Sequence, residues 1–373
     1  MYADELLGPW LNEMLQEYPG VRIFDAHTHL GENDPSGFSA TAAELEESLR
    51  LCDAQAAVFP MSDPQGYEKA NMQCAEAAAA SDGRLVAFVR VTPNERPEEL
   101  LAQGLANGAR GLKLHLSSDD FALDDPRLER ALAHADERRL PVVVHAGPEL
   151  DGIGETALTV SSRYPGLRMI LAHCALTDLG WIARHLDAHP NVFVDTSWWG
   201  PAHVLGLMRL VPPGRILNAS DLPYCTPLSG ALATLRCAHQ AGVGVQQVEA
   251  MAGGQLRRLL DGQDPLLLGP PTPQERTPLS PTLEILTDML IAALEPLQRG
   301  LDPGTPLDVA RHACKVPQDT PEAPVVASVA RLIELYDEHH DKLPQRNQFA
   351  PGWDLISAAS IVARTPSAPV PDV

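Results

Sequence analysis

Five short stretches of the sequence share one pattern, in which an apolar, β-prone run ends in a metal-competent or ionisable side chain. They are Phe24-Asp25-Ala26-His27-Thr28-His29, Gly111-Leu112-Lys113-Leu114-His115, Val142-Val143-Val144-His145, Met169-Ile170-Leu171-Ala172-His173 and Ile216-Leu217-Asn218-Ala219-Ser220-Asp221. Such a run is typical of a buried parallel strand. We therefore expect the fold to bring the carboxyl ends of these strands together and to place chemistry there.

The ligand types in these stretches favour a transition metal. His27 and His29 are two residues apart, so in a strand both imidazoles face the same side. A His-x-His pair also arises by chance, but this one follows an apolar run. His145 and His173 end consecutive predicted strands, and buried imidazoles need partners, which a metal supplies. Asp221 ends the last predicted strand, although aspartate also caps turns. Four imidazoles and one carboxylate suit Zn²⁺ better than calcium or magnesium.

Other polar residues near the strand ends are candidates for catalysis or substrate binding. Lys113 and His115 share one strand face, and a lysine inside a barrel must pair, shift its pKa or be modified. Arg90 ends another apolar run and would bind a substrate carboxylate or form a surface salt bridge. Trp198 and Tyr224 follow predicted strands and would cover an aromatic or alicyclic substrate, or pack under neighbouring loops.

The order of the elements predicts an α/β fold, a (β/α)8 TIM barrel. Eight strand-then-helix units run from the strand 21–25 to the helix 228–240. The spacing is regular, since the 84 residues from His29 to Lys113 make three units of 28. An open doubly wound sheet is the rival fold, but it would spread the candidate ligands along an edge, whereas a closed barrel makes them converge.

The chain is expected to divide into three parts. Residues 1–262 would form the barrel with a short N-terminal helix, and residues 263–364 a proline-rich helical appendage. Of the 34 prolines, 17 follow Gly262. Residues 365–373, with three prolines, are predicted to be a disordered tail. The apolar helix faces of the appendage must be buried, either against the barrel or in a homodimer.

The motifs resemble those of the amidohydrolase superfamily, in the branch of the pyrone-dicarboxylate lactonase-like hydrolases and the carboxymuconate-semialdehyde and resorcylate decarboxylases. The resemblance covers about residues 21–262 and does not extend to 263–373. The matching segments are Phe24-Asp25-Ala26-His27-Thr28-His29, Gly111-Leu112-Lys113-Leu114-His115, Asp124-Asp125-Pro126-Arg127-Leu128, Leu140-Pro141-Val142-Val143-Val144-His145-Ala146-Gly147, Leu171-Ala172-His173, Ala219-Ser220-Asp221 and Glu249-Ala250-Met251-Ala252-Gly253-Gly254-Gln255.

The resemblance implies a metal bound by His27, His29 and Asp221. In mononuclear members the residue matching His145 completes the site and the one matching His173 assists catalysis. In binuclear members the lysine matching Lys113 is carbamylated and bridges two metals, with both of those histidines on the second. All these residues are present. We expect one zinc ion rather than two, because this branch is mostly mononuclear.

The implied activity is metal-assisted hydrolysis of an amide, ester or lactone bond in a small, cyclic or carboxylate-bearing substrate. Asp221 would move the proton of the attacking water and His173 would stabilise the developing oxyanion. The first alternative is zinc-dependent, non-oxidative decarboxylation of an aromatic or dienoic acid. The second, from another class, is a non-catalytic binding or scaffold protein.

Composition restricts the partners. The net charge of −21 argues against nucleic acid and anionic membranes, both of which favour basic patches. No apolar run approaches 18 residues, and the acidic N-terminus does not resemble a signal peptide. The six cysteines contain no Cys-x-x-Cys pair and are expected to be reduced. We expect a cytoplasmic protein that acts on a small-molecule substrate and is a possible homodimer.

Overall fold

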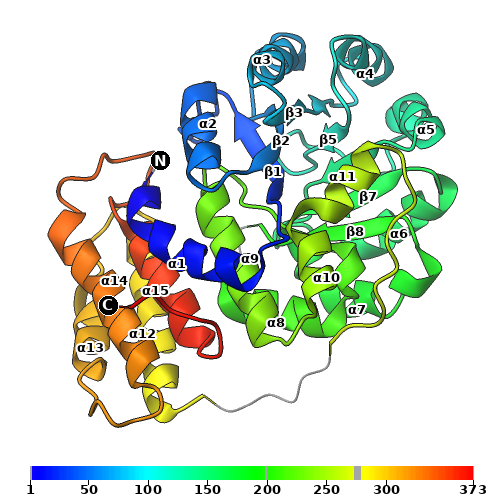
Figure 1. Ribbon diagram of the computed structural model, residues 1–373. Helices are drawn as coiled ribbons and strands as arrows, with labels where there is room; N and C mark the ends of the chain where they lie inside the picture. Colours follow the sequence, from blue (N-terminus) through cyan, green and yellow to red (C-terminus); the bar gives the residue numbers. More distant parts are fainter. Residues whose placement is uncertain (1, 198–199, 273–278, 373) are drawn as a thin grey trace.

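The computed structural model describes residues 2–197, 200–272 and 279–372. Parallel strands alternate with helices over its first two thirds, and four further helices follow (Figure 1). The strands are β1 (Phe24–Leu30), β2 (Gln55–Pro60), β3 (Leu85–Ala87), β4 (Val89–Arg90), β5 (Leu112–Leu114), β6 (Pro141–Val144), β7 (Arg168–Leu171), β8 (Val192–Asp195) and β9 (Ile216–Leu217). The helices are α1 (Asp4–Glu17), α2 (Ala42–Leu51), α3 (Tyr67–Ala80), α4 (Pro97–Ala106), α5 (Glu129–Glu137), α6 (Ile153–Arg163), α7 (Leu179–Ala183), α8 (Pro201–Leu210), α9 (Pro227–Gln240), α10 (Val245–Glu249), α11 (Gln255–Leu260), α12 (Pro281–Leu297), α13 (Gly304–Ala313), α14 (Ala323–His339) and α15 (Trp353–Arg364).

The strands form a (β/α)8 barrel. Strands β3 and β4 are two halves of one barrel strand, interrupted at Phe88, whose N–H donates to the Val58 carbonyl at 2.8 Å. The ladder continues from β4 to β9 in chain order. The segment after β9 closes the barrel against β1, because the Asp221 N–H donates to the His27 carbonyl at 2.8 Å and the His29 N–H to the Leu222 carbonyl at 2.9 Å. The predicted fold is confirmed.

Alternation along each strand separates two cores. Val142 and Val144 pack outward beneath the helices, whereas Val143 faces the barrel interior. The interior core also contains Phe59, Phe193 and eight other buried residues, which are Phe24, Ala26, Ala57, Phe88, Ile170, Ala172, Leu217 and Ala219. Because successive side chains point to opposite faces, the residues two positions beyond an inward residue also face inward. This register is what aims His145 into the barrel.

The amino-terminal end of the barrel is plugged. Leu256 and Leu259 of α11 belong to the interior core. The chain reaches them through a π-helical segment, Ala250–Gly254, that passes very close to the start of β1. A Cβ atom at Gly253 would lie 2.4 Å from the Arg22 carbonyl oxygen, so only glycine permits this approach. The closed bottom leaves the carboxyl end of the strands as the accessible mouth.

Most predicted elements lie within a few residues of their positions in the structure, and local signals explain why. Helix α2 begins with a capping box between Thr41 and Glu44, and α9 begins after the side-chain cap Thr226. The clearest difference is β1, which was predicted at 21–25 and runs from Phe24 to Leu30. The two histidines therefore lie inside the strand rather than beyond it. The segment 179–188 after β7 is α7 followed by a short 3₁₀ turn.

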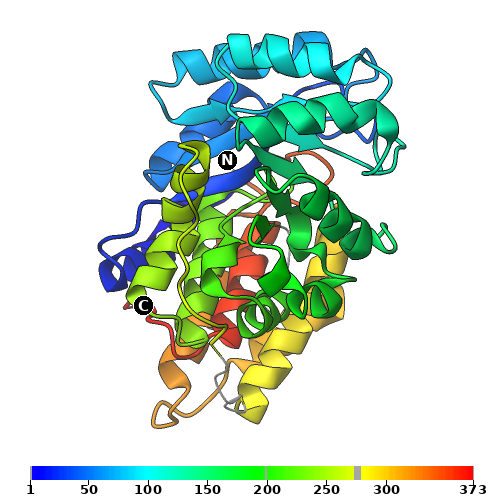
Figure 2. The ribbon, with the colours of Figure 1, turned by 90° about the vertical axis from the view of Figure 1, so that its right-hand side faces the viewer.

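The appendage, helices α12 to α15, packs against one side of the barrel and away from α3 to α5 (Figures 1 and 2). Helix α15 contacts α12 and α14 within the appendage and also α8 and α9 of the barrel. Its side chains Leu355, Ile356, Ala359 and Val362 are fully buried. The apolar faces of the appendage are thus covered mainly by its own helices and, through α15, by α8 and α9 of the barrel.

The prediction of a disordered tail does not hold for residues 365–372, which are packed against α9. The guanidinium of Arg236, itself fully buried, donates to the carbonyl of Thr365 at 3.1 Å and to that of Pro369 at 2.6 Å. Ala368 is also buried. Proline-rich termini are often disordered, but here a buried cation needs acceptors and the tail's carbonyl groups supply them.

All six cysteines are free thiols, four of them buried, as expected from their spacing. In the described part of the chain, no helix combines the length and the apolar character that crossing a membrane requires.

Candidate metal centre

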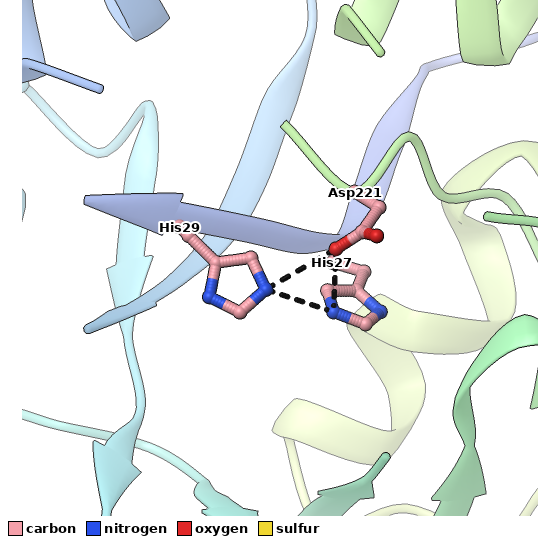
Figure 3. Close-up of side chains that lie close together, drawn as sticks. All are labelled: His27, His29 and Asp221. Carbon is pink, nitrogen blue, oxygen red and sulfur yellow. Dashed lines mark hydrogen bonds and ion pairs between the residues drawn. The ribbon is translucent and has the colours of Figure 1, made fainter. Parts of the chain in front are cut away.

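His27, His29 and Asp221 meet at the carboxyl end of β1 (Figure 3). The Asp221 Oδ1 atom lies 3.0 Å from His27 Nε2 and 3.2 Å from His29 Nε2, and the two Nε2 atoms are 3.1 Å apart. All three residues are buried. Asp221 follows the short strand β9 and has a φ of +66°, a left-handed conformation held by the hydrogen bond from its N–H to β1.

The hydrogen bonds behind the two imidazoles decide which nitrogens face the centre. His27 Nδ1 lies 3.0 Å from a carboxylate oxygen of Asp195, and His29 Nδ1 lies 3.3 Å from the Pro60 carbonyl oxygen. Both acceptors require a proton on Nδ1. Burial lowers the pKa of both histidines well below the ordinary value, so the rings are neutral and each Nε2 carries a lone pair.

Two lone pairs and one carboxylate oxygen therefore converge within hydrogen-bonding distance of one another. Three acceptors at this separation repel unless a cation or a donor lies among them. Lys113 Nζ lies 3.1 Å from His27 Nε2 and can donate to that atom. The chemistry of this ligand set fits a divalent transition metal.

Lys113 is completely buried on β5 and points toward the same centre. Its ammonium lies over the Phe59 ring, 4.6 Å from the centroid. Burial is the main cause that lowers the pKa of Lys113 to about 7, and the nearby Asp221 carboxylate opposes this effect. A lowered pKa favours the neutral amine, which is the form that modification by carbon dioxide requires.

His145 and His173 form a second pair beside the first cluster. His145 Nε2 contacts the Glu149 carboxylate at 2.5 Å, so His145 Nδ1 is left to face His173 Nε2 at 3.3 Å. On the far side of its ring, His173 Nδ1 lies 3.0 Å from the Ser197 hydroxyl. His173 Nε2 is 4.0 Å from Asp221 Oδ2, which joins the two groups into one centre.

The centre opens into a cavity of about 300 Å³. The candidates His115, Arg90 and Tyr224 all line it. His115 stacks on His145 with ring centroids 3.9 Å apart. The cavity is lined by His29, Asp34, Met61, Ser62, Arg90, His115, Ser117, Ser118, His145, Gly147, Pro148, Glu149, His173, Asp221 and Tyr224.

Arg90 is already bound to another residue of the chain. Its Nε and Nη2 atoms donate to the two oxygens of Asp119 at 3.1 and 2.9 Å, and the Tyr67 ring covers the guanidinium at 4.6 Å. Its Nη1 atom donates to the Pro60 carbonyl at 3.3 Å, the same carbonyl that faces His29. Arg90 therefore supports the wall of the centre from behind.

Three acidic residues of the site were not proposed from the sequence as functional. Asp195 binds His27, Glu149 binds His145 and Asp119 binds Arg90. Asp195 ends the apolar strand β8 and so fits the pattern of the other five runs, which is the signal that could have found it. Glu149 and Asp119 lie in loops without such a signal. The candidate Trp198 lies outside the described residues.

A closed (β/α)8 barrel with metal-competent side chains at the carboxyl ends of its strands defines a class of enzyme that works through divalent metals. The sequence profile of one family, described as amidohydrolase, matches residues 24–261. The chain belongs to this amidohydrolase family, whose members are enzymes. No curated protein matches the chain.

Solved structures similar to this one have the same barrel. A probable 2-pyrone-4,6-dicarboxylic acid hydrolase from Acinetobacter baumannii, with citric acid bound, is 15% identical at a TM-score of 0.52 and covers 65% of this chain and 100% of its own. A zinc-bound amidohydrolase from Burkholderia multivorans is 15% identical at a TM-score of 0.53, covering 65% and 99%. A TIM-barrel protein from Bordetella bronchiseptica is 17% identical at 0.52, covering 65% and 99%.

Proposed function

We propose that this protein is a zinc-dependent hydrolase that cleaves an amide, ester or lactone bond in a small molecule. The observation that supports this most is the convergence of two imidazole lone pairs and the Asp221 carboxylate at the base of a cavity. A zinc ion held by His27, His29 and Asp221 supplies Lewis acidity and lowers the pKa of water to about 7.

The chain's own side chains hold and move protons around the scissile bond. Asp221 contributes Oδ1 to the cluster, and its other oxygen, Oδ2, is placed to receive a proton and pass it to the leaving group. His173 lies 4.0 Å from the other oxygen of Asp221 and is placed to donate to a developing oxyanion. Asp195 keeps His27 in the tautomer that binds metal.

The cavity favours a substrate whose outer part is neutral or cationic. Among the described residues that line it, Arg90 is the one arginine or lysine, and Asp119 already neutralises its charge. Besides Asp221, two carboxylates, Asp34 and Glu149, line it, and the hydrogen bond with His145 lowers the pKa of Glu149 to about 2, which keeps that group ionised. A substrate carboxylate at this end would meet repulsion.

Asp221→Asn tests the proposed base. Asparagine keeps an oxygen for the metal but cannot accept the proton, so we expect kcat to fall by about 10²–10⁴-fold while metal remains bound. The variant and the wild type would be compared by hydrolysis of lactone, ester and amide panels, with metal content measured by plasma mass spectrometry. Near-normal turnover with metal still bound would show that another group is the base.

Lys113→Met tests the number of metals. Methionine has a similar length and no charge, so it fits the buried space without offering an amine. We expect about one zinc per chain in both proteins and a lower turnover in the variant, because Lys113 contacts His27. A wild type with about two zinc ions that loses one on mutation would instead establish a carbamate-bridged pair.

The alternatives give different products. Hydrolysis consumes water and releases a new carboxyl group, whereas decarboxylation releases carbon dioxide from an aromatic or dienoic acid without consuming water. Release of labelled carbon dioxide from a panel of such acids, each labelled with carbon-13 in its carboxyl group, would favour the decarboxylase. If the protein bound no zinc when the metal was supplied, the result would favour the third hypothesis, a non-catalytic binding or scaffold protein.

A further inference from the structure

The connection between α14 and α15 makes a tight turn, residues 346–349, that lies on the β1–α2 loop of the barrel. An isolated antiparallel bridge joins Arg346 to Phe349 across the turn. The Asn347 side-chain oxygen accepts from the Ser39 N–H at 2.8 Å, and Arg346 forms an ion pair with Glu44 at 2.5 Å. We call this turn the clasp. It attaches the appendage to the loop that carries Asp34 of the cavity wall.

Aromatic rings continue the contact from the clasp to the cavity. Phe349, which is buried, packs on Phe38 of the same loop with centroids 5.5 Å apart. Phe38 packs on Tyr224 at 4.6 Å, and Tyr224 lines the cavity. The Tyr224 N–H donates to the Asp221 carbonyl at 2.9 Å. Three rings and one turn therefore link the appendage to the residue at the centre of the site.

A second path runs through the N-terminal segment. The Asn347 side-chain amide donates to the Tyr2 hydroxyl at 3.1 Å, and that hydroxyl donates to the Pro223 carbonyl at 2.9 Å. The Tyr2 ring also packs edge-on against Trp353 at the start of α15, with centroids 5.9 Å apart. In Figure 1 the connection that precedes α15 reaches the start of the chain beside α1. Pro223 directly precedes Tyr224, so both paths fix the same stretch of wall.

We propose that the clasp is a specificity element of the active site, which fixes the β1–α2 loop and Tyr224 as the outer wall that the non-reacting part of the substrate contacts. Asn347 and Phe349 are positioning residues that act through Phe38, Tyr224 and the loop. The clasp lies beyond residue 261, where the match to the family profile ends. The specificity role rests on the proposed hydrolase function. The fixing of the β1–α2 loop and Tyr224 by the clasp does not depend on that function.

Two variants remove the clasp's contacts. Asn347 has a φ of +55°, so Asn347→Gly keeps the backbone and removes both side-chain hydrogen bonds. Phe349→Ala removes the first ring, and Phe349→Leu restores most of its volume as a rescue. Gln345→Ala is the matched control, because Gln345 is an exposed side chain two residues before Asn347.

Hydrogen–deuterium exchange of the metal-loaded full-length protein tests the link without a substrate. We expect peptides covering 31–41 and 222–224 to exchange at least about tenfold faster in Asn347→Gly and Phe349→Ala, with the wild-type rate in Gln345→Ala and partial recovery in Phe349→Leu. Unchanged exchange in both variants would overturn the inference.

Hydrolysis of a small lactone, δ-valerolactone, and of a larger aromatic one, dihydrocoumarin, tests specificity. We expect the KM for the larger ester to rise about tenfold, with kcat, metal content and the small substrate nearly unchanged. An equal fall in kcat for both, or no change in either, would refute the specificity role. If the wild type hydrolysed none of the lactones, esters and amides, the proposed function would be wrong. The exchange experiment would still decide whether the clasp fixes the β1–α2 loop and residues 222–224.

Discussion

Replacing His27 with alanine is expected to reduce the zinc content to less than about a tenth of an ion per chain and kcat/KM by at least about 10³-fold. The reason is geometric, because His27 Nε2 lies within 3.1 Å of both His29 Nε2 and Asp221 Oδ1, and these two atoms alone make a weak site. The loss corresponds to about 4 kcal/mol of transition-state stabilisation. Plasma mass spectrometry and steady-state kinetics on the same preparation would measure both effects.

The control for this substitution is His312→Ala, which removes an exposed imidazole from α13 in the appendage. Its metal content and activity should match the wild type. Thermal unfolding of metal-free samples separates loss of metal from loss of fold. If His27→Ala still bound a full equivalent of zinc, the metal would have to lie elsewhere, with His145 and His173 as the next candidates.

The sequence was informative about the site where the strand period determines which way a side chain points. The period does not do this for His173, because Ile170 and Ala172 are the inward residues of that run and His173 leaves the alternation through a left-handed backbone with a φ of +56°. His145 does follow the period, since it lies two residues after the inward Val143 and so faces the mouth. The same reasoning placed Lys113 beside His27, although 86 residues separate them. Closure of the barrel then brings side chains from different strands close together, because all the parallel strands end at the same rim.

What the sequence could not provide were contacts made by loops and by distant segments. Asp119 reaches Arg90 from a loop, so the arginine for which the sequence left open a substrate carboxylate or a surface salt bridge forms a buried internal ion pair. The turn containing Asn347 contacts Ser39, which lies more than 300 residues earlier, and no local sequence pattern predicts such a hydrogen bond. The packed tail at Arg236 is of the same kind, because a buried guanidinium selects its acceptors only after the fold has formed.

Asp195→Asn is the second substitution with a large expected effect, because it reverses the hydrogen bond that sets the tautomer of His27. One Asp195 oxygen faces His27 Nδ1 at 3.0 Å, while the other accepts from the backbone N–H groups of His173 and Ser197. An asparagine keeps its oxygen toward these two donors, so its amide must face His27. The amide then donates to Nδ1, and the proton of the neutral ring moves to Nε2, the atom that should bind metal.

We expect this variant to bind zinc about 10–100-fold more weakly and to lose activity in proportion at limiting metal. Competition with a chromogenic chelator would give the affinity, and nitrogen-edited NMR of the metal-free protein would report the tautomer directly. Asp187→Asn, on an exposed side chain, is the matched control. A wild-type affinity together with an unchanged His27 tautomer would mean that Asp195 only supports the backbone. A changed tautomer with unchanged affinity would instead remove His27 Nε2 from the ligand set, since an imidazole nitrogen that keeps its proton cannot bind a metal.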